Sequence, residues 1–302
     1  MNELAARLRR EVRGKILLNE PLSPYTSWRL GGPADVLVLP ASLDDVAAVQ
    51  ELARERGVPV TVLGGGSNVL IADSGLRGVV VRIGRPLSAV RITDDVVEAE
   101  CGAPFPRIGR LTVQRGLTGL EFAGGVPGTL GGALAMNAGA HDQSTAAVVL
   151  EVTAVDARGR VVRLSREDMD FSYRSSRLQK EPGLVAVKAK LRLREASPAE
   201  VRERMRAFME RRRRTQPVGT KNAGSVFKNP PGDFAGRLVE AAGCKGMAVG
   251  DAMVSPMHAN FIINRGAATA DDVRRLIEKV QTAVFERFGV ELAPEVRMLG
   301  FA

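Results

Sequence analysis

The chain has 302 residues, 45% of them hydrophobic and 25% charged, a composition typical of a soluble globular protein with about two domains. No apolar run approaches the roughly 20 residues that span a bilayer, and 4% aromatic residues argue against a stacking platform for single-stranded nucleic acid. The net charge of +9 is dominated by Arg. Nucleic acid, an anionic membrane surface, anionic small molecules or genome base composition would each account for it.

The first third of the chain alternates helix and strand, which predicts packed layers of both. Ser42 with Asp45 forms a capping pattern that begins a helix, and Gly57 stands where its C-terminal cap belongs. A strand rich in β-branched residues follows. The expected elements are a helix over 42–57, strands over 58–63, 79–83 and 96–100, and a helix over 104–115.

The middle of the chain predicts more sheet, and the last third predicts helices. Residues 184–193 read as a strand with alternating faces: Val187, Ala189, Leu191 and Leu193 lie on one side and Lys188, Lys190 and Arg192 on the other. Ser197 and Pro198 begin a long charged helix, and we place the domain boundary there. The expected elements are a hairpin over 148–156 and 160–164, helices over 198–214, 233–242 and 269–288, and a strand over 260–263.

Two cysteines and the N-terminus bear on cellular location. Cys101 and Cys244 are far apart in sequence and make a disulfide framework improbable, which favours a reducing cytoplasm. Residues 1–13 are charged and periodic and do not resemble a signal peptide. We therefore expect a cytoplasmic protein without membrane insertion.

A first glycine-rich loop, residues 64–68, follows directly on the strand over 58–63. Consecutive glycines permit positive φ and close approach of a ligand to the backbone, and successive N–H groups there can bind an anion. The residues after the loop predict a strand or turn, where a dinucleotide-binding fingerprint needs a helix. A plain turn explains three glycines about equally well.

A second glycine-rich loop, residues 124–139, is harder to explain by turns alone. Six of its sixteen residues are glycine, and each glycine costs backbone entropy on folding. Close approach of a large phosphate-bearing ligand explains this composition better. The expected cofactor-binding residues are Gly64, Gly65, Gly66, Ser67, Asn68, Gly125, Val126, Pro127, Gly128, Thr129, Gly131, Gly132, Asn137, Ala138 and Gly139.

Together the two loops resemble the FAD-binding domain of the vanillyl-alcohol-oxidase type. Further segments, in matching order over nearly the whole chain, resemble the UDP-N-acetylenolpyruvoylglucosamine reductases of peptidoglycan precursor synthesis. These segments are Ser172-Tyr173-Arg174-Ser175-Ser176, Asn222-Ala223-Gly224-Ser225-Val226-Phe227-Lys228-Asn229-Pro230, His258-Ala259-Asn260-Phe261 and Ala293-Pro294-Glu295-Val296-Arg297.

The resemblance implies an α+β fold. An FAD-binding domain over 1–197 would have lobes of about 1–84 and 85–197. An α/β substrate-binding domain over 198–302 would return a strand near 293–300 to the active site. The implied reaction is NADPH-dependent reduction of UDP-N-acetylglucosamine enolpyruvate to UDP-N-acetylmuramate through FAD. The implied partners are FAD, NADPH and the UDP-sugar, with no nucleic acid and no obligatory protein partner.

The resemblance also implies three catalytic residues. Arg174 would contact the substrate carboxylate, for which a guanidinium fork is suited. Ser225 would donate a proton to the carbanion, and Glu295 would help polarise the carboxylate. Taken alone, these side chains would be a surface Arg, a turn Ser and a strand-end Glu paired with Arg297.

Further residues are expected to bind the substrate, but no metal is expected, because His141 and His258 lack ligand spacing to a partner. His141 is expected to be structural. The short stretch between Tyr173 and residue 184 leaves no room for the tyrosine-bearing loop of one branch of the family, so the chain resembles the shorter branch. The expected substrate-binding residues are Tyr173, Lys228, Asn229, His258, Asn260 and, from the run Arg211–Arg214, Arg212.

Overall fold

The computed structural model describes residues 1–301 and divides into two compact units. Unit 1 comprises Met1–Glu20, Ala34–Gly65 and Arg77–Arg211. Unit 2 comprises Pro21–Pro33, Gly66–Leu76 and the chain from Arg212 onward. These limits differ from the expected 1–197 and 198–302, because two N-terminal segments pack with the C-terminal part.

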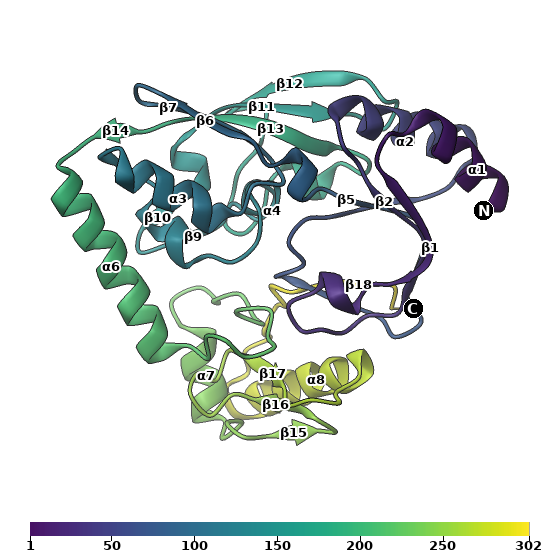
Figure 1. Cartoon of the computed structure of the whole chain (residues 1–302). Coiled ribbons are helices and arrows are strands. Elements are labelled where there is room, and N and C mark those ends of the chain that lie inside the picture. The colour runs from purple at the N-terminus through teal and green to yellow at the C-terminus, as the bar shows by residue number, and fades with distance from the viewer. Residues whose placement is uncertain (302) are drawn as a thin grey trace. The chain divides into compact units, whose positions relative to one another are not determined.

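The first sheet of unit 1 has the strand order β1-β2-β5-β3, with β3 and β5 parallel. Helices α1 and α2 bury Leu8, Val46 and Val49 against the same apolar core as Val79 and Val81 of β5 (Figure 1). The strands are β1 (Lys15–Pro21), β2 (Pro33–Leu39), β3 (Val60–Leu63) and β5 (Leu76–Arg82), and the helices are α1 (Asn2–Glu11) and α2 (Leu43–Glu55).

The second sheet of unit 1 is antiparallel, with the order β12-β11-β13-β7-β6. The predicted alternation along β13 is confirmed: Val187 and Leu191 are buried, and Lys188 donates to Glu98 on β7 at 2.7 Å. The strands are β6 (Val90–Thr93), β7 (Val96–Glu100), β11 (Val149–Val155), β12 (Val161–Ser165) and β13 (Val185–Arg192).

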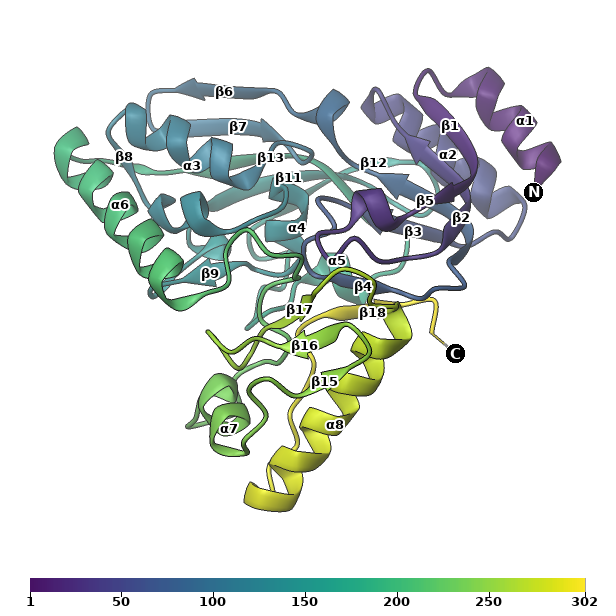
Figure 2. The ribbon, with the colours of Figure 1, turned by 60° about the horizontal axis from the view of Figure 1, so that its bottom comes forward.

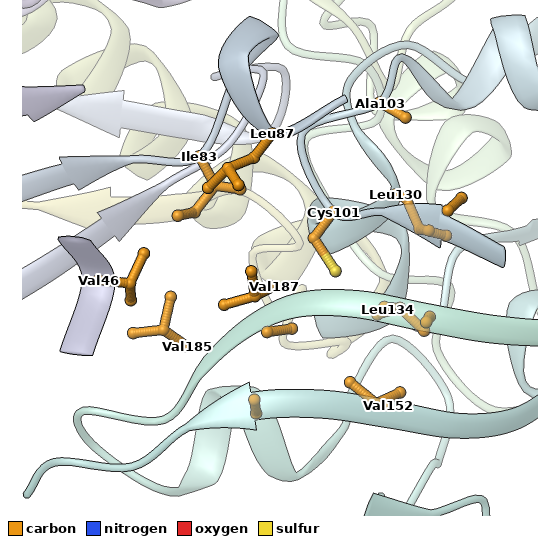
Figure 3. Packing of buried hydrophobic residues seen from close by; sticks show 14 of the residues in the cluster. Val46, Ile83, Leu87, Cys101, Ala103, Leu130, Leu134, Val152, Val185 and Val187 are labelled. Atoms are coloured by element: carbon orange, nitrogen blue, oxygen red, sulfur yellow. The ribbon is translucent and has the colours of Figure 1, made fainter. Parts of the chain in front are cut away.

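Helices pack on this second sheet through short apolar faces. Leu130 and Leu134 of α4 are fully buried in one core with Val152 and Val187 of the sheet, and Figure 3 shows how these side chains lie. The remaining elements of unit 1 before residue 198 are η2 (Arg85–Leu87), α3 (Phe105–Gln114), β8 (Leu117–Thr118), η3 (Glu121–Gly125), α4 (Leu130–Ala135), β9 (Gly139–Ala140), β10 (Gln143–Ser144), η4 (Thr145–Ala147), α5 (Arg177–Lys180) and β14 (Arg194–Glu195).

Helix α6 (Pro198–Thr215) stays with unit 1 for most of its length. Its buried residues Val201 and Met205 pack against Val113 of α3. Most of this helix therefore groups with unit 1 by packing, and the domain boundary placed at residue 198 stays a prediction.

Unit 2 has a small sheet with the order β15-β16-β17 and a separate parallel pair, β4 with β18. Helix α8 lies beside this small sheet (Figure 2), and its Leu276 and Ile277 are buried in the core of the unit. Its N-cap Thr269 forms a capping box with Asp272. The elements are η1 (Ser23–Tyr25), β4 (Val69–Ile71), α7 (Ala235–Ala241), β15 (Ala248–Val249), β16 (Ala252–Val254), β17 (Ile262–Asn264), α8 (Ala270–Phe288) and β18 (Arg297–Leu299).

Trp28 explains why an N-terminal segment belongs to unit 2. Its side chain is fully buried in the core of this unit, and its indole N–H donates to the carbonyl of Ile262 at 2.8 Å. The carbonyl of Trp28 in turn accepts from the amide of Asn264. A buried Trp needs such a partner for its N–H, and the partner lies more than two hundred residues along the chain.

Candidate functional site

The two glycine-rich loops lie against each other within unit 1. A Cβ on Gly65 would come within 2.7 Å of the Cα of Gly128, and one on Gly64 within 2.6 Å of the Thr129 hydroxyl oxygen. A side chain at Gly65 would force the backbones of the two loops apart, and one at Gly64 would displace the Thr129 hydroxyl. The glycines at 64 and 65 are therefore required by contact between the loops themselves.

The end of the first loop, in unit 2, is fixed by the segment around η1. Gly66 has φ of +63°, and a Cβ there would lie 2.0 Å from the carbonyl oxygen of Tyr25. The backbone N–H and the hydroxyl of Ser27 both donate to the Gly66 carbonyl, at 3.0 and 3.3 Å. Only glycine satisfies both the backbone conformation and the space.

The second loop leads into helix α4, and the first backbone N–H groups of that helix already donate to acceptors within the protein. Leu130 donates to the carbonyl of Ala103, Gly131 to that of Cys101, and Gly132 to the hydroxyl of the N-cap, Thr129. An anion at this site would therefore need other amides of the two loops. The sequence interpretation did not foresee this internal bonding.

Gly132 is the glycine whose surroundings leave most room for a ligand. It lies inside α4, is exposed, and a Cβ there would meet only the Thr129 hydroxyl oxygen, at 3.9 Å. A helix-interior glycine costs about 0.5–1 kcal/mol relative to alanine, and neither φ nor packing requires it here. Space kept free beside the paired loops fits close approach of a large cofactor such as FAD.

Tyr173 and Arg174 form the tip of a tight turn in unit 1. Ser172 and Ser175 exchange two backbone hydrogen bonds across it, at 3.1 and 3.2 Å. Arg174 adopts a left-handed backbone conformation with φ of +53°, which is uncommon for a residue with a side chain. Tyr173 is 55% exposed, and the Arg174 guanidinium lies over its ring.

The residues after α4 hold this turn. The Arg174 guanidinium donates to the carbonyl of Gly139 at 3.1 Å, and the amide of Asn137 donates to that of Ser172 at 3.0 Å. Asn137 also accepts from the N–H of Ala146, while the carbonyl of Ala138 accepts from Thr145. Two expected cofactor residues, Asn137 and Gly139, therefore support the turn that carries Arg174.

Ser225 and Glu295 lie on two segments of unit 2 that pair antiparallel. Phe227 bridges to Pro294, the N–H of Glu295 donates to Val226 at 2.7 Å, and that of Lys228 donates to Ala293 at 2.9 Å. Gly224, with φ of +77°, makes the turn that precedes Ser225. The fold thus brings together two expected catalytic residues that are 70 positions apart.

Asn68 joins the first glycine-rich loop to this pair of segments. Its amide donates to the carbonyl of Glu295 at 3.0 Å, and its own carbonyl accepts from the N–H of Arg297. The parallel pairing of β4 with β18 continues the contact. An expected cofactor residue and an expected catalytic residue are therefore neighbours within unit 2.

Asn260 supports the Ser225 segment rather than pointing its amide into open space. Its side chain accepts from the N–H and donates to the carbonyl of Phe227, both at 2.9 Å, and is 4% exposed. Strand β17 begins at Ile262, two residues later than the expected residue 260. In this structure, Asn260 positions the segment on which Ser225 and Lys228 lie.

His258 lies beside Asn260 with an uncharged ring. Burial first, and then the charge of Lys245, lower the pKa of its imidazole. Its Nδ1 accepts from the N–H of Asn260 at 3.2 Å, which leaves the proton on Nε2. The ring can therefore donate one hydrogen bond to a ligand but supplies no positive charge near neutral pH.

The other expected substrate residues fall in both units. Asn229, exposed, accepts from the N–H of Ala235 at the start of α7, and Lys228 is half-buried on the Ser225 segment. Arg212, half-buried near the end of α6, has a guanidinium whose pKa is lowered by burial. Unit 1 holds Tyr173 and Arg174, and unit 2 the remainder.

His141, expected to be structural, stacks on Phe208 of α6 at 4.0 Å between ring centroids. Burial first, and then Arg211, lower the pKa of its imidazole. Within residues 1–301, no group of three or more His, Cys, Asp or Glu side chains is arranged to hold a metal ion. Nor is any helix in that range long and apolar enough to cross a membrane.

Sequence reasoning missed Arg82 and Gln179. Arg82 is the last residue of β5 and pairs with Leu63, the residue before the first loop. The chain thus places an arginine next to the start of that loop. The carboxyl edge of parallel strands is where ligands gather in such sheets, and that rule could have found it. Gln179 contacts the Arg174 turn from α5, and no sequence signal pointed to it.

Comparison with known proteins identifies the family. Residues 34–165 match an FAD binding domain, and residues 216–299 match the C-terminal domain of UDP-N-acetylenolpyruvoylglucosamine reductase. The reductase of that name from Rubrobacter xylanophilus is 49% identical over 282 residues, covering 93% of this chain and 94% of the relative. The chain belongs to this reductase family. The reductase from Heliobacterium modesticaldum is 47% identical over 292 residues, covering 96% and 93%.

The fold of the reductase family is also shared. The crystal structure of UDP-N-acetylenolpyruvylglucosamine reductase from Thermus caldophilus matches with a TM-score of 0.83 and 33% identity, covering 95% of this chain and 99% of that one. The family predicted from the sequence motifs is therefore confirmed. So are the α+β class, the FAD-binding domain and the assignment as a flavin-dependent oxidoreductase.

Proposed function

We propose that this protein reduces UDP-N-acetylglucosamine enolpyruvate to UDP-N-acetylmuramate, with NADPH as reductant and FAD as resident cofactor, in the cytoplasm. The observation that carries the proposal is the antiparallel pairing of the Ser225 and Glu295 segments. Asn68 bonds the first glycine-rich loop to the same segments. The expected proton donor and the expected carboxylate thus lie on paired segments, one of which bonds a residue of the loop expected to hold the cofactor.

The glycine-rich loops would hold FAD through backbone groups and close approach, as the open side of Gly132 allows. When bound, the flavin would take a hydride from NADPH and pass it to the terminal carbon of the enolpyruvyl ether. The cofactor ligands we propose are those expected from the sequence: Gly64, Gly65, Gly66, Ser67, Asn68, Gly125, Val126, Pro127, Gly128, Thr129, Gly131, Gly132, Asn137, Ala138 and Gly139.

In the second half of the reaction, the protein's own residues would stabilise the negative charge on the substrate and supply the proton. Arg174 binds the substrate carboxylate, into which negative charge spreads as hydride arrives. The Ser225 hydroxyl gives its proton to the carbon next to the carboxylate, which is basic enough at that moment to take it. Glu295 polarises the carboxylate or its acid form.

The remaining proposed substrate residues would recognise the sugar nucleotide. Lys228 and Arg212 supply positive charge for the two phosphates. His258, whose Nδ1 accepts from the N–H of Asn260, offers its Nε2–H to an acceptor on the substrate. Tyr173, Asn229 and Asn260 complete the set, Asn260 by holding the Ser225 segment in place.

The test is stopped-flow absorbance of the flavin in two half-reactions, with Ser225→Ala as the variant. NADPH should still bleach the flavin at the wild-type rate. Reoxidation by the enolpyruvyl substrate should slow by roughly 10²–10⁴-fold, the usual contribution of a general acid. Ser197→Ala, an exposed serine before α6, serves as the matched control.

Two outcomes would count against the proposal. Equal slowing of both half-reactions in Ser225→Ala would give the serine a structural role only. A purified protein with no visible flavin absorption, even after FAD is supplied, would overturn the assignment as a whole.

A further inference from the structure

The turn that carries Arg174 is held in an unfavourable backbone conformation by side chains outside it. A left-handed φ of +53° costs a residue with a Cβ about 1–2 kcal/mol. Such conformations persist where the surrounding structure over-determines them, and they gather at functional sites. The contacts that hold the backbone of Arg174 are therefore expected to matter for its function.

Two amide side chains reach this turn from either side. Gln179 on α5 donates to the carbonyl of Arg174 at 3.3 Å and to that of Ala135 at 2.6 Å. Asn137 donates to the carbonyl of Ser172 at 3.0 Å. Gln179 therefore bonds the second half of the turn, and Asn137 bonds its first residue.

Both amides tie the turn to the end of helix α4. The carbonyl of Ala135, in the last turn of that helix, lacks a partner within the helix, as terminal carbonyls do. It accepts from Gln179 and from the hydroxyl of Ser176, at 2.6 and 2.9 Å. Asn137 follows the helix by two residues and also accepts from Ala146.

The other end of α4 is the expected cofactor site. Thr129 caps the helix there, and Gly132 leaves the open space described above. The helix itself is held by Leu130 and Leu134, both fully buried on the sheet (Figure 3). A six-residue helix fixed in the core thus joins the glycine-rich loop to the Arg174 turn.

We propose that Asn137 and Gln179 are positioning residues that hold Arg174, through the end of α4, at a fixed distance from the cofactor-binding loop. The proposal rests on the proposed role of Arg174 at the substrate carboxylate. It reassigns the Asn137 side chain from cofactor contact to support of the turn. Displacement of a positioning group by about 1 Å can cost on the order of 10²-fold in rate.

The test compares Gln179→Met, which keeps the volume but removes the amide, with Lys180→Ala on the same short helix. Lys180 is exposed and pairs with Asp170. In Gln179→Met, FAD content and the rate of reduction by NADPH should stay within about twofold of wild type. Reoxidation by the enolpyruvyl substrate should slow by roughly 10–100-fold, with a raised KM. Lys180→Ala should change neither half-reaction.

A double-mutant cycle with Arg174→Ala separates positioning from a general structural effect. If Gln179 acts through Arg174, Gln179→Met should slow reoxidation further by less than about twofold when Arg174 is already Ala. Asn137→Asp, which keeps the acceptor but loses the donor to Ser172, should behave like Gln179→Met and carries the test if that variant does not fold.

Four results would overturn the inference. Multiplicative effects in the cycle, or slowing of NADPH reduction equal to that of reoxidation, would show that Gln179 only stabilises the fold. Wild-type reoxidation in Gln179→Met with strong loss in Arg174→Ala would refute the positioning role alone. Wild-type reoxidation in Arg174→Ala would instead refute the proposed role of Arg174, and this inference with it.

Discussion

The two glycine-rich loops look alike in sequence, but the three glycines of the first loop and Gly132 of the second differ in what surrounds them. In the first loop, Gly64, Gly65 and Gly66 each lie so close to other parts of the chain that a Cβ would approach within 2.7 Å of another atom. In the second, Gly132 would tolerate a Cβ without any contact closer than 3.9 Å. A run of glycines can therefore be required by packing within the protein, while a single glycine with open space around it points to a ligand.

The largest effect is expected where the first loop meets its own chain. Gly66→Ala should lower the free energy of unfolding by about 3–5 kcal/mol, because positive φ and a clash with the Tyr25 carbonyl act together. Gly57→Ala is the matched control: φ is +61°, but no atom lies within 4 Å of the new Cβ. It should cost only about 1 kcal/mol. Urea denaturation measures both, and equal losses would refute the packing argument.

A smaller effect is expected at the base of the second loop, where Glu121 begins η3. Its carboxylate is fully buried and accepts from the Thr118 hydroxyl at 2.7 Å, the Gly119 N–H at 2.8 Å and Arg204 at 3.0 Å. Burial acts to raise the pKa of this carboxyl, but these hydrogen bonds outweigh it and hold the pKa below 4.5. Glu121→Gln should cost about 2 kcal/mol of unfolding free energy at pH 7.

The pH dependence of that loss has a definite sign. Because the folded-state pKa of Glu121 lies below the unfolded value, its contribution is complete above the unfolded pKa and is lost as pH falls through the folded pKa. The difference between wild type and Glu121→Gln, measured by denaturation from pH 7 to acid, should therefore shrink below about pH 4.5. A difference independent of pH would show that the charge of Glu121 is not what stabilises the loop.

The smallest effect, and the sharpest test of the comparison, is at Gly132. Gly132→Ala should raise the stability of the FAD-free protein by about 0.5–1 kcal/mol, since alanine is the better helix former. The same methyl group should weaken FAD binding, measured by flavin fluorescence on reconstitution. Gly131→Ala should instead lower stability, because its Cβ would lie 3.2 Å from that of Cys101. Unchanged FAD affinity in Gly132→Ala would remove the argument that this glycine faces the cofactor.

Much of the molecule was predictable from local sequence signals. The cap at Ser42, the start of a helix near residue 269, the alternation along residues 187–193 and the two glycine-rich loops all appear where the sequence places them. Signals of this kind depend on neighbouring residues and on the periods of helix and strand, which a single sequence displays directly. The motifs that indicated the reductase family are equally local, and that family is confirmed.

Only the tertiary structure decided which distant segments meet. Trp28 is buried in the core of unit 2, and Asn68 hydrogen-bonds Glu295. The side-chain amide of Asn260 hydrogen-bonds the backbone of Phe227. The conformation of Arg174 and its hold on α4 through Gln179 are of the same kind. Each depends on a pairing of backbone groups or a packing of side chains far apart in the chain, and local propensity carries no information about which partner will be chosen. The sequence by itself determined the elements, the loops and the family, and tertiary packing determined which of their residues stand together.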